Sequence, residues 1–520
     1  MARDAQGDVI AFLSTPAAFG LRAGAVDRID THISIVWLAG DRAFKLKRAV
    51  RFDYVDFSTS ELRRVACEAE VRLNRRTAPA LYRGVLPVTR EADGSLALAG
   101  QGVPIDWLVE MARFDQDTLF DRLAVRNRLD LSLMEQLADA IVRLHADAER
   151  RRDRGGRGGT AWVIESNARG FAEQGAGVLD PAACERLTAE AHRALGRCDE
   201  LLEARRRQGS VRWCHGDLHL RNICLIDGRP TLFDAIEFNQ DISCIDVLYD
   251  LSFLLMDLWR RDLRSHANTV FNEYFARTVD LGGLPLLPLF LSCRAAVRAK
   301  TSVTAASVQP DERQRHDLHA ASRQYLTLAQ TFLRPPPACL IAVGGLSGSG
   351  KSTLARGLGP GIGPAPGALI LRSDAIRKTL LGVAPLTRLG PEGYSPAMSR
   401  HVYQTLAGHA LTALKAGHAV IADAVYARAE EREQIASVAR EAGVPFVGLW
   451  IDGPPQVLAR RLRERIMDAS DATGDVLQRQ LLCGIGRLDW HRLDGSRDPE
   501  RVQQSAEAHY RECRHQPLHS

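Results

Sequence analysis

The sequence of 520 residues lacks a strong charge of either sign, because 68 lysines and arginines stand against 63 aspartates and glutamates, a net charge of +5. So small an excess on so long a chain argues against nucleic acid as the partner. The ten cysteines include no CxxC pair, which argues against a zinc ribbon or a disulfide scaffold. We therefore expect a reduced, cytoplasmic protein.

Long apolar runs are missing as well. The first residues, MARDAQGDVIAF, carry acidic groups early and lack the apolar centre of a signal peptide. The apolar stretch 281–291 is interrupted by two glycines and two prolines, so it falls short of the about 18 residues that a membrane helix needs. We expect no membrane partner, and the sequence carries no signal for an oligomeric state.

A run of three prolines, residues 335–337, divides the chain, because proline cannot continue a helix and favours an extended connector. We predict a first domain over 1–334, a linker over 335–338 and a second domain over 339–520. The second domain alternates apolar strands with helical runs; the strands read CLIAV, ALILRS, HAVIADA and VPFVGLWID. This alternation predicts an α/β, doubly wound parallel sheet with helices on both faces.

The first domain mixes strands and helices. Two strands, HISIVWLAG and RAFKLKRAV, meet at a turn, and a helix follows over 60–76 with Thr59 or Ser60 as its cap. Helical patterns then dominate 129–333. The arginine- and glycine-rich stretch 150–159 is interpreted as a solvated loop, with a phosphate or nucleic-acid contact as the alternative.

A group of polar residues interrupts the helical part, in the segment VRWCHGDLHLRNICLIDGRPTLFD, residues 211–234. The apolar pieces ICLI and TLF around a DGRP turn predict a hairpin, which brings Asn222 and Asp234 to neighbouring strand ends. Their two oxygens suit Mg²⁺, which prefers oxygen ligands. Asp217 lies on the preceding loop, where it could accept a proton from a substrate hydroxyl. This order of base, asparagine and metal aspartate is typical of kinases.

The sequence HGDLHLRN followed by FD resembles the aminoglycoside phosphotransferase branch of the protein-kinase-like fold. The resemblance covers roughly residues 30–330 and implies an α+β kinase fold that binds ATP. It implies that Lys45 grips the ATP phosphates and that Glu70 pairs with that lysine. Lys47 shares the strand face with Lys45 and is its rival, and Glu68 is the alternative to Glu70. The sequence departs from the wider kinase pattern because no GxGxxG loop precedes Lys45.

The second domain opens with GLSGSGKS, a full match to GxxxxGK followed by serine or threonine. It follows a strand and starts a helical run, which is the context that a P-loop requires. Backbone N–H groups of the loop would hold phosphates, Lys351 would reach the β- and γ-phosphates, and the Ser352 hydroxyl would bind Mg²⁺. The nucleotide-binding residues predicted here are Gly345, Ser347, Gly348, Ser349, Gly350, Lys351, Ser352 and Thr353.

Two acidic residues follow later strands of this domain. The SDAIR sequence around Asp374 resembles small P-loop kinases of the gluconate, shikimate and polynucleotide 5′-hydroxyl type. In those kinases the aspartate binds or deprotonates the acceptor hydroxyl; the alternative is a helix N-cap. Asp423 ends the strand HAVIAD and suits a contact to the magnesium shell.

The segment QVLARRLRERI places arginines beside an apolar stripe, and a segment rich in aspartate follows it. It resembles the arginine-bearing lid of P-loop kinases, which neutralises charge on the transferred phosphoryl group. We predict Arg461 and Arg465 as the catalytic pair, with Arg460 and Arg463 as alternatives. A solvated basic helix face is the competing interpretation.

Together these patterns resemble bifunctional aminoglycoside phosphotransferase/ATP-binding proteins. We predict an ATP- and Mg²⁺-dependent phosphotransferase with two nucleotide-binding modules, acting on a small-molecule hydroxyl. The catalytic residues would be Asp217, Asp374, Lys351, Arg461 and Arg465, and the metal ligands Asn222, Asp234, Ser352 and Asp423. The alternatives are a regulatory ATPase or nucleotide sensor, and a kinase acting on a nucleic-acid end or a nucleotide sugar.

Overall fold

The structure of the chain is a computed structural model that describes residues 2–22, 26–52, 55–384, 386–464, 471 and 474–514. The chain forms two compact units. Unit 1 comprises Met1–Asp257 and Cys293–Ala329, and unit 2 comprises Leu258–Ser292 and Gln330–Ser520. Two segments of the chain therefore contribute to each unit.

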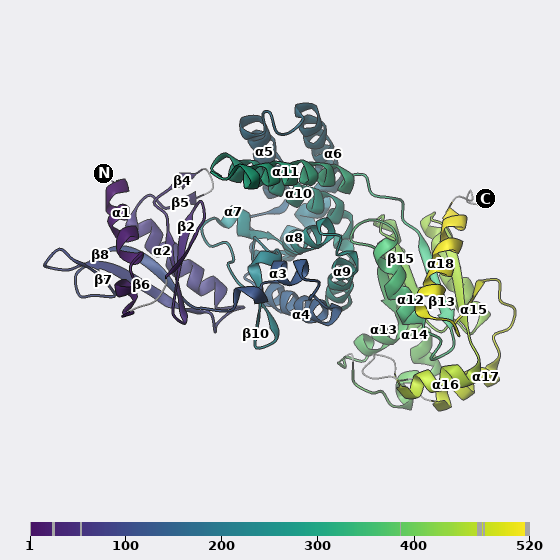
Figure 1. Cartoon of the computed structure of the whole chain (residues 1–520). Coiled ribbons are helices and arrows are strands. Elements are labelled where there is room, and N and C mark those ends of the chain that lie inside the picture. The colour runs from purple at the N-terminus through teal and green to yellow at the C-terminus, as the bar shows by residue number, and fades with distance from the viewer. Residues whose placement is uncertain are drawn as a thin grey trace. The chain divides into compact units, whose positions relative to one another are not determined.

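Unit 1 begins with an antiparallel sheet in the order β1-β2-β3-β8-β6-β7, with α2 packed on β8 and β6 (Figure 1). The predicted strand pair and helix are confirmed, and the Thr59 side chain caps α2 by accepting from the Leu62 N–H. The strands are β1 (Asp27–Asp30), β2 (Ser34–Ala39), β3 (Arg42–Lys47), β6 (Tyr82–Arg90), β7 (Leu96–Leu98) and β8 (Val103–Ala112). The helices here are α1 (Ala2–Leu13) and α2 (Ser60–Asn74), and β4 (Arg51–Phe52) pairs with β5 (Val55–Asp56).

The rest of unit 1 is mainly helical around two short strand pairs. The predicted hairpin is β10 (Ile223–Ile226) with β11 (Arg229–Leu232), and β9 (Val211–Trp213) pairs with β12 (Cys244–Asp246). The helices are α3 (Phe120–Val125), α4 (Leu131–Asp147), α5 (Gly156–Gln174), α6 (Pro181–Gln208), α7 (Gln240–Ser243), α8 (Val247–Arg260), α10 (Leu287–Ser307) and α11 (Glu312–Phe332). The last residues of α8 and α11 and the first residues of α10 belong to unit 2.

Unit 2 contains a parallel sheet in the order β14-β15-β13-β16-β17. The strands are β13 (Leu340–Gly345), β14 (Leu369–Arg372), β15 (Val420–Asp423), β16 (Phe446–Asp452) and β17 (His491–Asp494). The predicted doubly wound fold is confirmed: α12 (Lys351–Leu358) and α18 (Pro499–Arg514) share a core with β13, while α14 contacts β14 and β15. The other helices are α13 (Ser373–Leu380), α14 (Pro396–Lys415), α15 (Ala429–Ala442), α16 (Pro455–Glu464) and α17 (Gly474–Cys483).

The segment Leu258–Ser292, which we predicted within the first domain, packs in unit 2. Its helix α9 (Arg264–Thr278) lies against β14, the edge strand of the sheet. The Asn272 side chain accepts from the Ile370 N–H at 2.6 Å and donates to the Ala368 carbonyl at 3.1 Å. The Asn268 amide also donates to the Ala368 carbonyl, at 3.0 Å, so side chains of α9 satisfy backbone groups at this edge of the sheet and join the segment to unit 2.

Two expectations about unusual stretches need correction. Among the described residues, Leu281–Ser307 is a helical stretch long and apolar enough to cross a membrane, although 72% of its apolar window is buried inside the protein. The prolines do not interrupt it, because Pro285 lies in a 3₁₀ turn (Leu281–Leu286) that leads into α10. The stretch 150–159 is a loop only in its first half, since α5 begins at Gly156.

Candidate active sites

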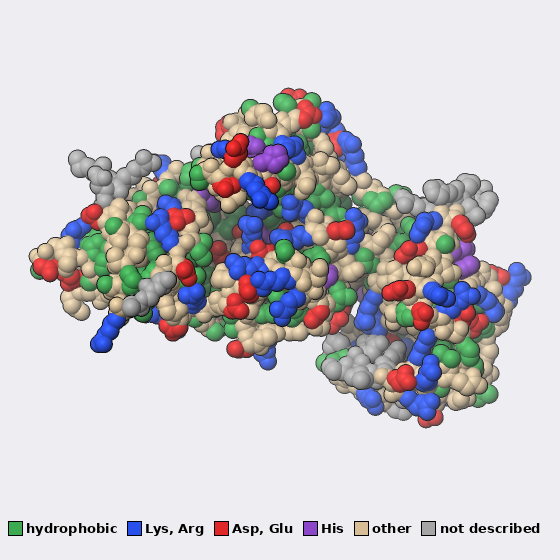
Figure 2. All heavy atoms as spheres, viewed as in Figure 1, with side chains coloured by type: hydrophobic (Ala, Val, Ile, Leu, Met, Phe, Trp, Pro, Cys, Tyr) green, Lys and Arg blue, Asp and Glu red, His purple; other side chains and the backbone are tan. Residues whose placement is uncertain are grey.

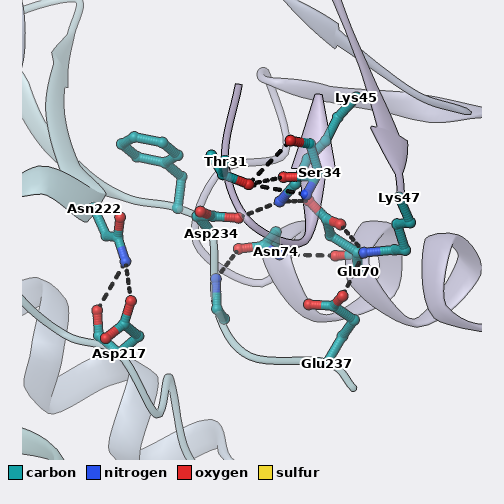
Figure 3. A network of polar contacts seen from close by, with 12 residues as sticks. Thr31, Ser34, Lys45, Lys47, Glu70, Asn74, Asp217, Asn222, Asp234 and Glu237 are labelled. Atoms are coloured by element: carbon teal, nitrogen blue, oxygen red, sulfur yellow. Dashed lines mark hydrogen bonds and ion pairs between the residues drawn. The ribbon is translucent and has the colours of Figure 1, made fainter. Parts of the chain in front are cut away.

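The loop 214–222 of unit 1, between β9 and β10, brings Asp217 and Asn222 together (Figure 3). The Asn222 amide nitrogen donates to the Asp217 carbonyl and to its Oδ2, each at 2.9 Å. His219 Nε2 lies 3.3 Å from the same Oδ2. Burial opposes ionisation of Asp217, but His219 and then Arg298 outweigh it and hold its pKa well below the usual value. Asp217 is therefore a fixed carboxylate, and its side chain remains 35% exposed.

Asp234 follows the hairpin in a left-handed backbone conformation, with φ of +62°. Such a conformation is uncommon for a residue other than glycine and needs support from its surroundings. The Asp234 N–H donates to the Tyr82 hydroxyl at 3.1 Å, and the next N–H, of Ala235, donates to Asn74 Oδ1 at 2.8 Å. These contacts from β6 and α2 turn the Asp234 carboxylate towards Lys45 (Figure 3).

Lys45 on β3 bridges two carboxylates. Its Nζ lies 2.8 Å from Glu70 Oε1 and 2.6 Å from Asp234 Oδ1. Glu70 on α2 is completely buried, whereas Glu68 pairs with Arg64 at the surface. The structure thus places Glu70, and not Glu68, beside the lysine. Burial disfavours the charged form of Glu70, but Lys45 and Lys47 together lower its pKa to about 2.

The turn between β1 and β2 occupies the position where a glycine-rich loop would lie. It contains Thr31, His32 and Ile33 and no glycine. The Thr31 hydroxyl accepts from the Ser34 N–H at 2.9 Å and donates to the Ser34 carbonyl at 3.0 Å (Figure 3). A hydroxyl-closed turn therefore replaces the missing glycines.

The residues predicted to bind Mg²⁺ in unit 1 offer a fitting set of donors. Asn222 uses its amide nitrogen on Asp217, so its amide oxygen points away from that residue (Figure 3). The Asp234 side chain is 42% exposed, and it faces the same region as the lysine. An amide oxygen and a carboxylate are hard oxygen ligands of the kind Mg²⁺ prefers.

Asp250 on α8 holds the backbone of the loop 214–222 in place. Its two carboxylate oxygens accept from the backbone N–H groups of His215 and Gly216, at 3.1 and 2.8 Å. His145 Nε2 lies 3.1 Å from Oδ2. Asp246, at the end of β12, pairs with Arg205 at 2.7 Å.

We expect Asp250→Asn to lower the free energy of unfolding of unit 1 by about 3–5 kcal/mol, because it breaks a buried charged network. Burial opposes ionisation of Asp250, but the His145 contact lowers its pKa to about 2. A lowered folded-state pKa stabilises fully above the unfolded value, about 3.9, and this contribution, on the order of 2 kcal/mol, is lost as pH falls towards 2. The difference between the urea midpoints of wild type and variant should therefore become smaller, without vanishing, as pH falls from 5 to 2. The control is Asp147→Asn, at an exposed position of α4. It should change neither the free energy of unfolding nor its dependence on pH.

The P-loop of unit 2 connects β13 to α12, as predicted. Gly348 and Gly350 both have positive φ values, +83° and +98°, which the tight loop requires. The Ser352 hydroxyl donates to Asp423 Oδ2 at 2.6 Å. Asp423 is 4% exposed, so a hydroxyl and a buried carboxylate lie together, a donor pair that suits Mg²⁺. Lys351 Nζ donates to the Leu346 carbonyl at 3.0 Å and so folds back over the loop.

Two residues at this site were missed by the sequence analysis. Arg372, at the end of β14, donates to the Ser352 hydroxyl at 3.3 Å and lies 3.5 Å from Asp423 Oδ2. Gln480 on α17 accepts from the Ser347 N–H at 2.9 Å. Arg372 could have been found from the sheet, because the strand order pairs it with Asp423 in register. No sequence signal indicated Gln480.

The remaining predicted residues of unit 2 lie in different environments. Asp374 is in the first turn of α13, whose N-cap is Arg372, so the N-cap alternative for Asp374 is wrong. Burial and then the charge of Asp374 raise the pKa of Tyr394. Arg461 donates to the Gly495 carbonyl at 2.7 Å. Arg465 lies outside the described residues.

Both parts of the chain are similar to known proteins. Residues 54–284 match the model of the phosphotransferase enzyme family, and residues 340–482 match the model of an AAA domain. An uncharacterized protein of Mycobacterium tuberculosis is 28% identical over 491 residues, covering 92% of this chain and 93% of the relative. Adenylyl-sulfate kinase of Myxococcus xanthus is 35% identical over 117 residues, 22% of this chain and 59% of that enzyme. A solved aminoglycoside phosphotransferase is 14% identical with a TM-score of 0.36, covering 61% of this chain and 98% of that structure.

These matches support a kinase enzyme with two domains. The N-terminal part, which matches the phosphotransferase enzyme family over residues 54–284, has the kinase-like fold, and the C-terminal part is a P-loop kinase-like domain.

Proposed function

We propose that the protein transfers the γ-phosphate of Mg²⁺-ATP to a small-molecule hydroxyl, and that each unit has a nucleotide site of its own. The observation that carries this proposal is the geometry of unit 1. An ionised Asp217 is held by Asn222, and Lys45 joins Glu70 to Asp234. These are the base, the metal ligands and the phosphate-binding lysine that phosphoryl transfer needs.

In unit 1, the acceptor hydroxyl would lie beside Asp217. The acceptor oxygen forms the new bond to the γ-phosphorus, the bond from that phosphorus to ADP breaks, and the hydroxyl proton passes to Asp217 Oδ. His219 and Asn222 hold the carboxylate in place for this transfer. Asn222 and Asp234 would hold Mg²⁺, which when bound neutralises phosphate charge. Lys45 would bind phosphate oxygens and is kept oriented by Glu70.

In unit 2, the P-loop backbone and Lys351 would bind the phosphates, and Ser352 with Asp423 would hold Mg²⁺. Asp374 is the acceptor-side base by the resemblance to small P-loop kinases. The likeness of this part to an adenylyl-sulfate kinase supports a small-molecule acceptor for unit 2. Arg461 and Arg465 would neutralise the charge on the transferred phosphoryl group. A cytoplasmic location is also part of the proposal.

The test is transfer of labelled γ-phosphate from Mg²⁺-ATP to a panel of aminoglycosides, sugars, sugar acids and nucleosides. Wild type is compared with Lys351→Ala and Asp217→Ala. We expect at least one acceptor to be labelled, and each variant to lose the products of one unit. Transfer that persists unchanged in both variants contradicts the assigned sites.

If ATP is hydrolysed slowly and no acceptor is labelled, the protein is a regulatory ATPase or nucleotide sensor instead. A nucleic-acid substrate has less support. Three arginines of the stretch 150–159 pair with acidic residues: Arg151 with Asp153, Arg154 with Asp241 and Arg157 with Asp199. Their charge is thus largely compensated within the protein. Binding of an oligonucleotide at low salt is the measurement that would restore this alternative.

A further inference from the structure

Lys45 and Lys47 lie on the same face of β3, because side chains alternate along a strand. Both contact Glu70, and each takes a different oxygen (Figure 3). Lys45 Nζ is 2.8 Å from Oε1, and Lys47 Nζ is 2.6 Å from Oε2. One completely buried carboxylate therefore serves two lysines.

The second partner of each lysine separates their roles. Lys45 reaches Asp234, whose side chain is 42% exposed and is a predicted metal ligand. Lys47 pairs with Glu237, whose side chain is 4% exposed, and Lys47 itself is 2% exposed. The Lys47 ammonium also lies 5.1 Å from the centre of the Phe57 ring. Only Lys45 has a partner that a nucleotide could replace, whereas Lys47 is enclosed by fixed groups.

The charges of this cluster explain why a second pair would be useful. In the structure, Lys45 and Lys47 face three carboxylates, those of Glu70, Asp234 and Glu237. If Asp234 turns to a bound metal, Lys45 loses one partner. The two positive charges of the lysines are then balanced by the two negative charges of the remaining glutamates. Glu70 therefore keeps its contact with Lys47 while Lys45 binds phosphate oxygens.

We propose that Lys47 and Glu237 are positioning residues of the nucleotide site in unit 1. They fix the second oxygen of Glu70, so that Glu70 holds Lys45 in place when Lys45 exchanges Asp234 for the phosphates of ATP. The inference rests on the proposed role of Lys45 in binding ATP. In this inference Lys47 has no contact with the nucleotide, and Lys45 is the lysine that binds the phosphates.

The test measures Mg²⁺-ATP binding by calorimetry in the full chain carrying Lys351→Ala, so that binding reports unit 1. The main variant is the double substitution Lys47→Met with Glu237→Met, because removing both partners leaves no uncompensated buried charge. We expect a urea midpoint close to that of the parent and a Kd for Mg²⁺-ATP at least about tenfold weaker. Lys45→Met should weaken binding at least as much.

The matched control is a second buried ion pair that, like the contacts of Glu70, involves helix α2. Arg63 on α2 lies 2.7 Å from Asp106 on β8, and both are buried. Because Arg63 also donates to the Phe57 carbonyl, the double substitution Arg63→Met with Asp106→Asn should lower the urea midpoint, but it should not change the Kd by more than twofold. If this control weakens Mg²⁺-ATP binding as much as the Lys47 and Glu237 variant does, the effect is a general loosening of α2 and the inference is overturned.

Glu237→Gln is a near-isosteric second variant in case the double variant does not fold. It keeps a hydrogen-bond acceptor for Lys47 and removes one charge, and we expect a Kd several-fold weaker than that of the parent. An unchanged Kd in the foldable Glu237 variants, with binding lost in Lys45→Met, overturns the inference and leaves the nucleotide site standing. An unchanged Kd in Lys45→Met as well overturns both the inference and the proposed nucleotide site of unit 1.

Discussion

Replacing Asp217 by asparagine should reduce kcat for acceptor-dependent transfer by unit 1 by about 10²–10⁴, the usual contribution of a positioned general base. An amide cannot accept the hydroxyl proton as a carboxylate does, although its oxygen can still accept from the Asn222 amide nitrogen. The shape of the site and the affinity for Mg²⁺-ATP should therefore be retained. The measurement is kcat with the acceptor found in the panel, in a chain whose P-loop is inactivated by Lys351→Ala, together with the Kd for Mg²⁺-ATP.

Asp241→Asn is the matched control for this variant. Asp241 also pairs with a cationic side chain, Arg154, but its own side chain is 57% exposed. An exposed pair contributes about 0–1 kcal/mol, so the control should keep both kcat and Kd. An Asp217→Asn variant with wild-type kcat would show that another group takes the proton or that unit 1 has no transfer activity.

Lys351→Ala should have the second large effect, on unit 2. Loss of a charged hydrogen-bond donor to the phosphates should weaken Mg²⁺-ATP binding to this unit roughly 10- to 100-fold. It should lower kcat by a further 10²–10³ or so, because the same ammonium faces the charge that develops on the transferred group. Transfer is measured in a chain carrying Asp217→Asn, and binding in a chain carrying Lys45→Met, so that unit 2 is observed alone in each measurement.

Asp423→Asn separates the metal from the phosphate contact. Asp423 accepts from the Ser352 hydroxyl at 2.6 Å, so its charge should matter chiefly for Mg²⁺. We expect transfer by unit 2 to require a higher Mg²⁺ concentration, with a smaller change in binding of ATP without metal. Lys415→Ala, at an exposed pair with Glu441, is the control and should change neither the Mg²⁺ requirement nor the binding of ATP.

A Lys351→Ala chain that binds Mg²⁺-ATP normally through unit 2 contradicts the P-loop assignment.

Much of the fold follows from short patterns of the sequence. The two strands around the turn between β2 and β3, the Thr59 cap of α2 and the apolar strands of unit 2 are local signals, and the structure contains each of these elements. The glycines and the GKS end of the P-loop define its conformation locally as well, because positive φ values at Gly348 and Gly350 need residues without a Cβ.

The placement of Leu258–Ser292 could not be predicted in this way. Nothing in the sequence of α9 indicates that Asn272 bonds to Ile370 and Ala368, almost a hundred residues further on. The proline run at 335–337 indicated a linker, but backbone groups at a sheet edge are satisfied by whichever side chain packs there. Membership of a compact unit is decided by such long-range contacts.

The sequence by itself identified the polar groups that each unit offers. HGD with Asn222 and Asp234 predicts a base and two oxygen ligands, and the P-loop predicts a phosphate site, because each motif places its groups on one short segment of the chain. Tertiary structure alone decided between Glu68 and Glu70 and gave Lys45 and Lys47 different partners. The two lysines occupy equivalent positions on one strand face, so only the packing of α2 and the position of Glu237 can distinguish them.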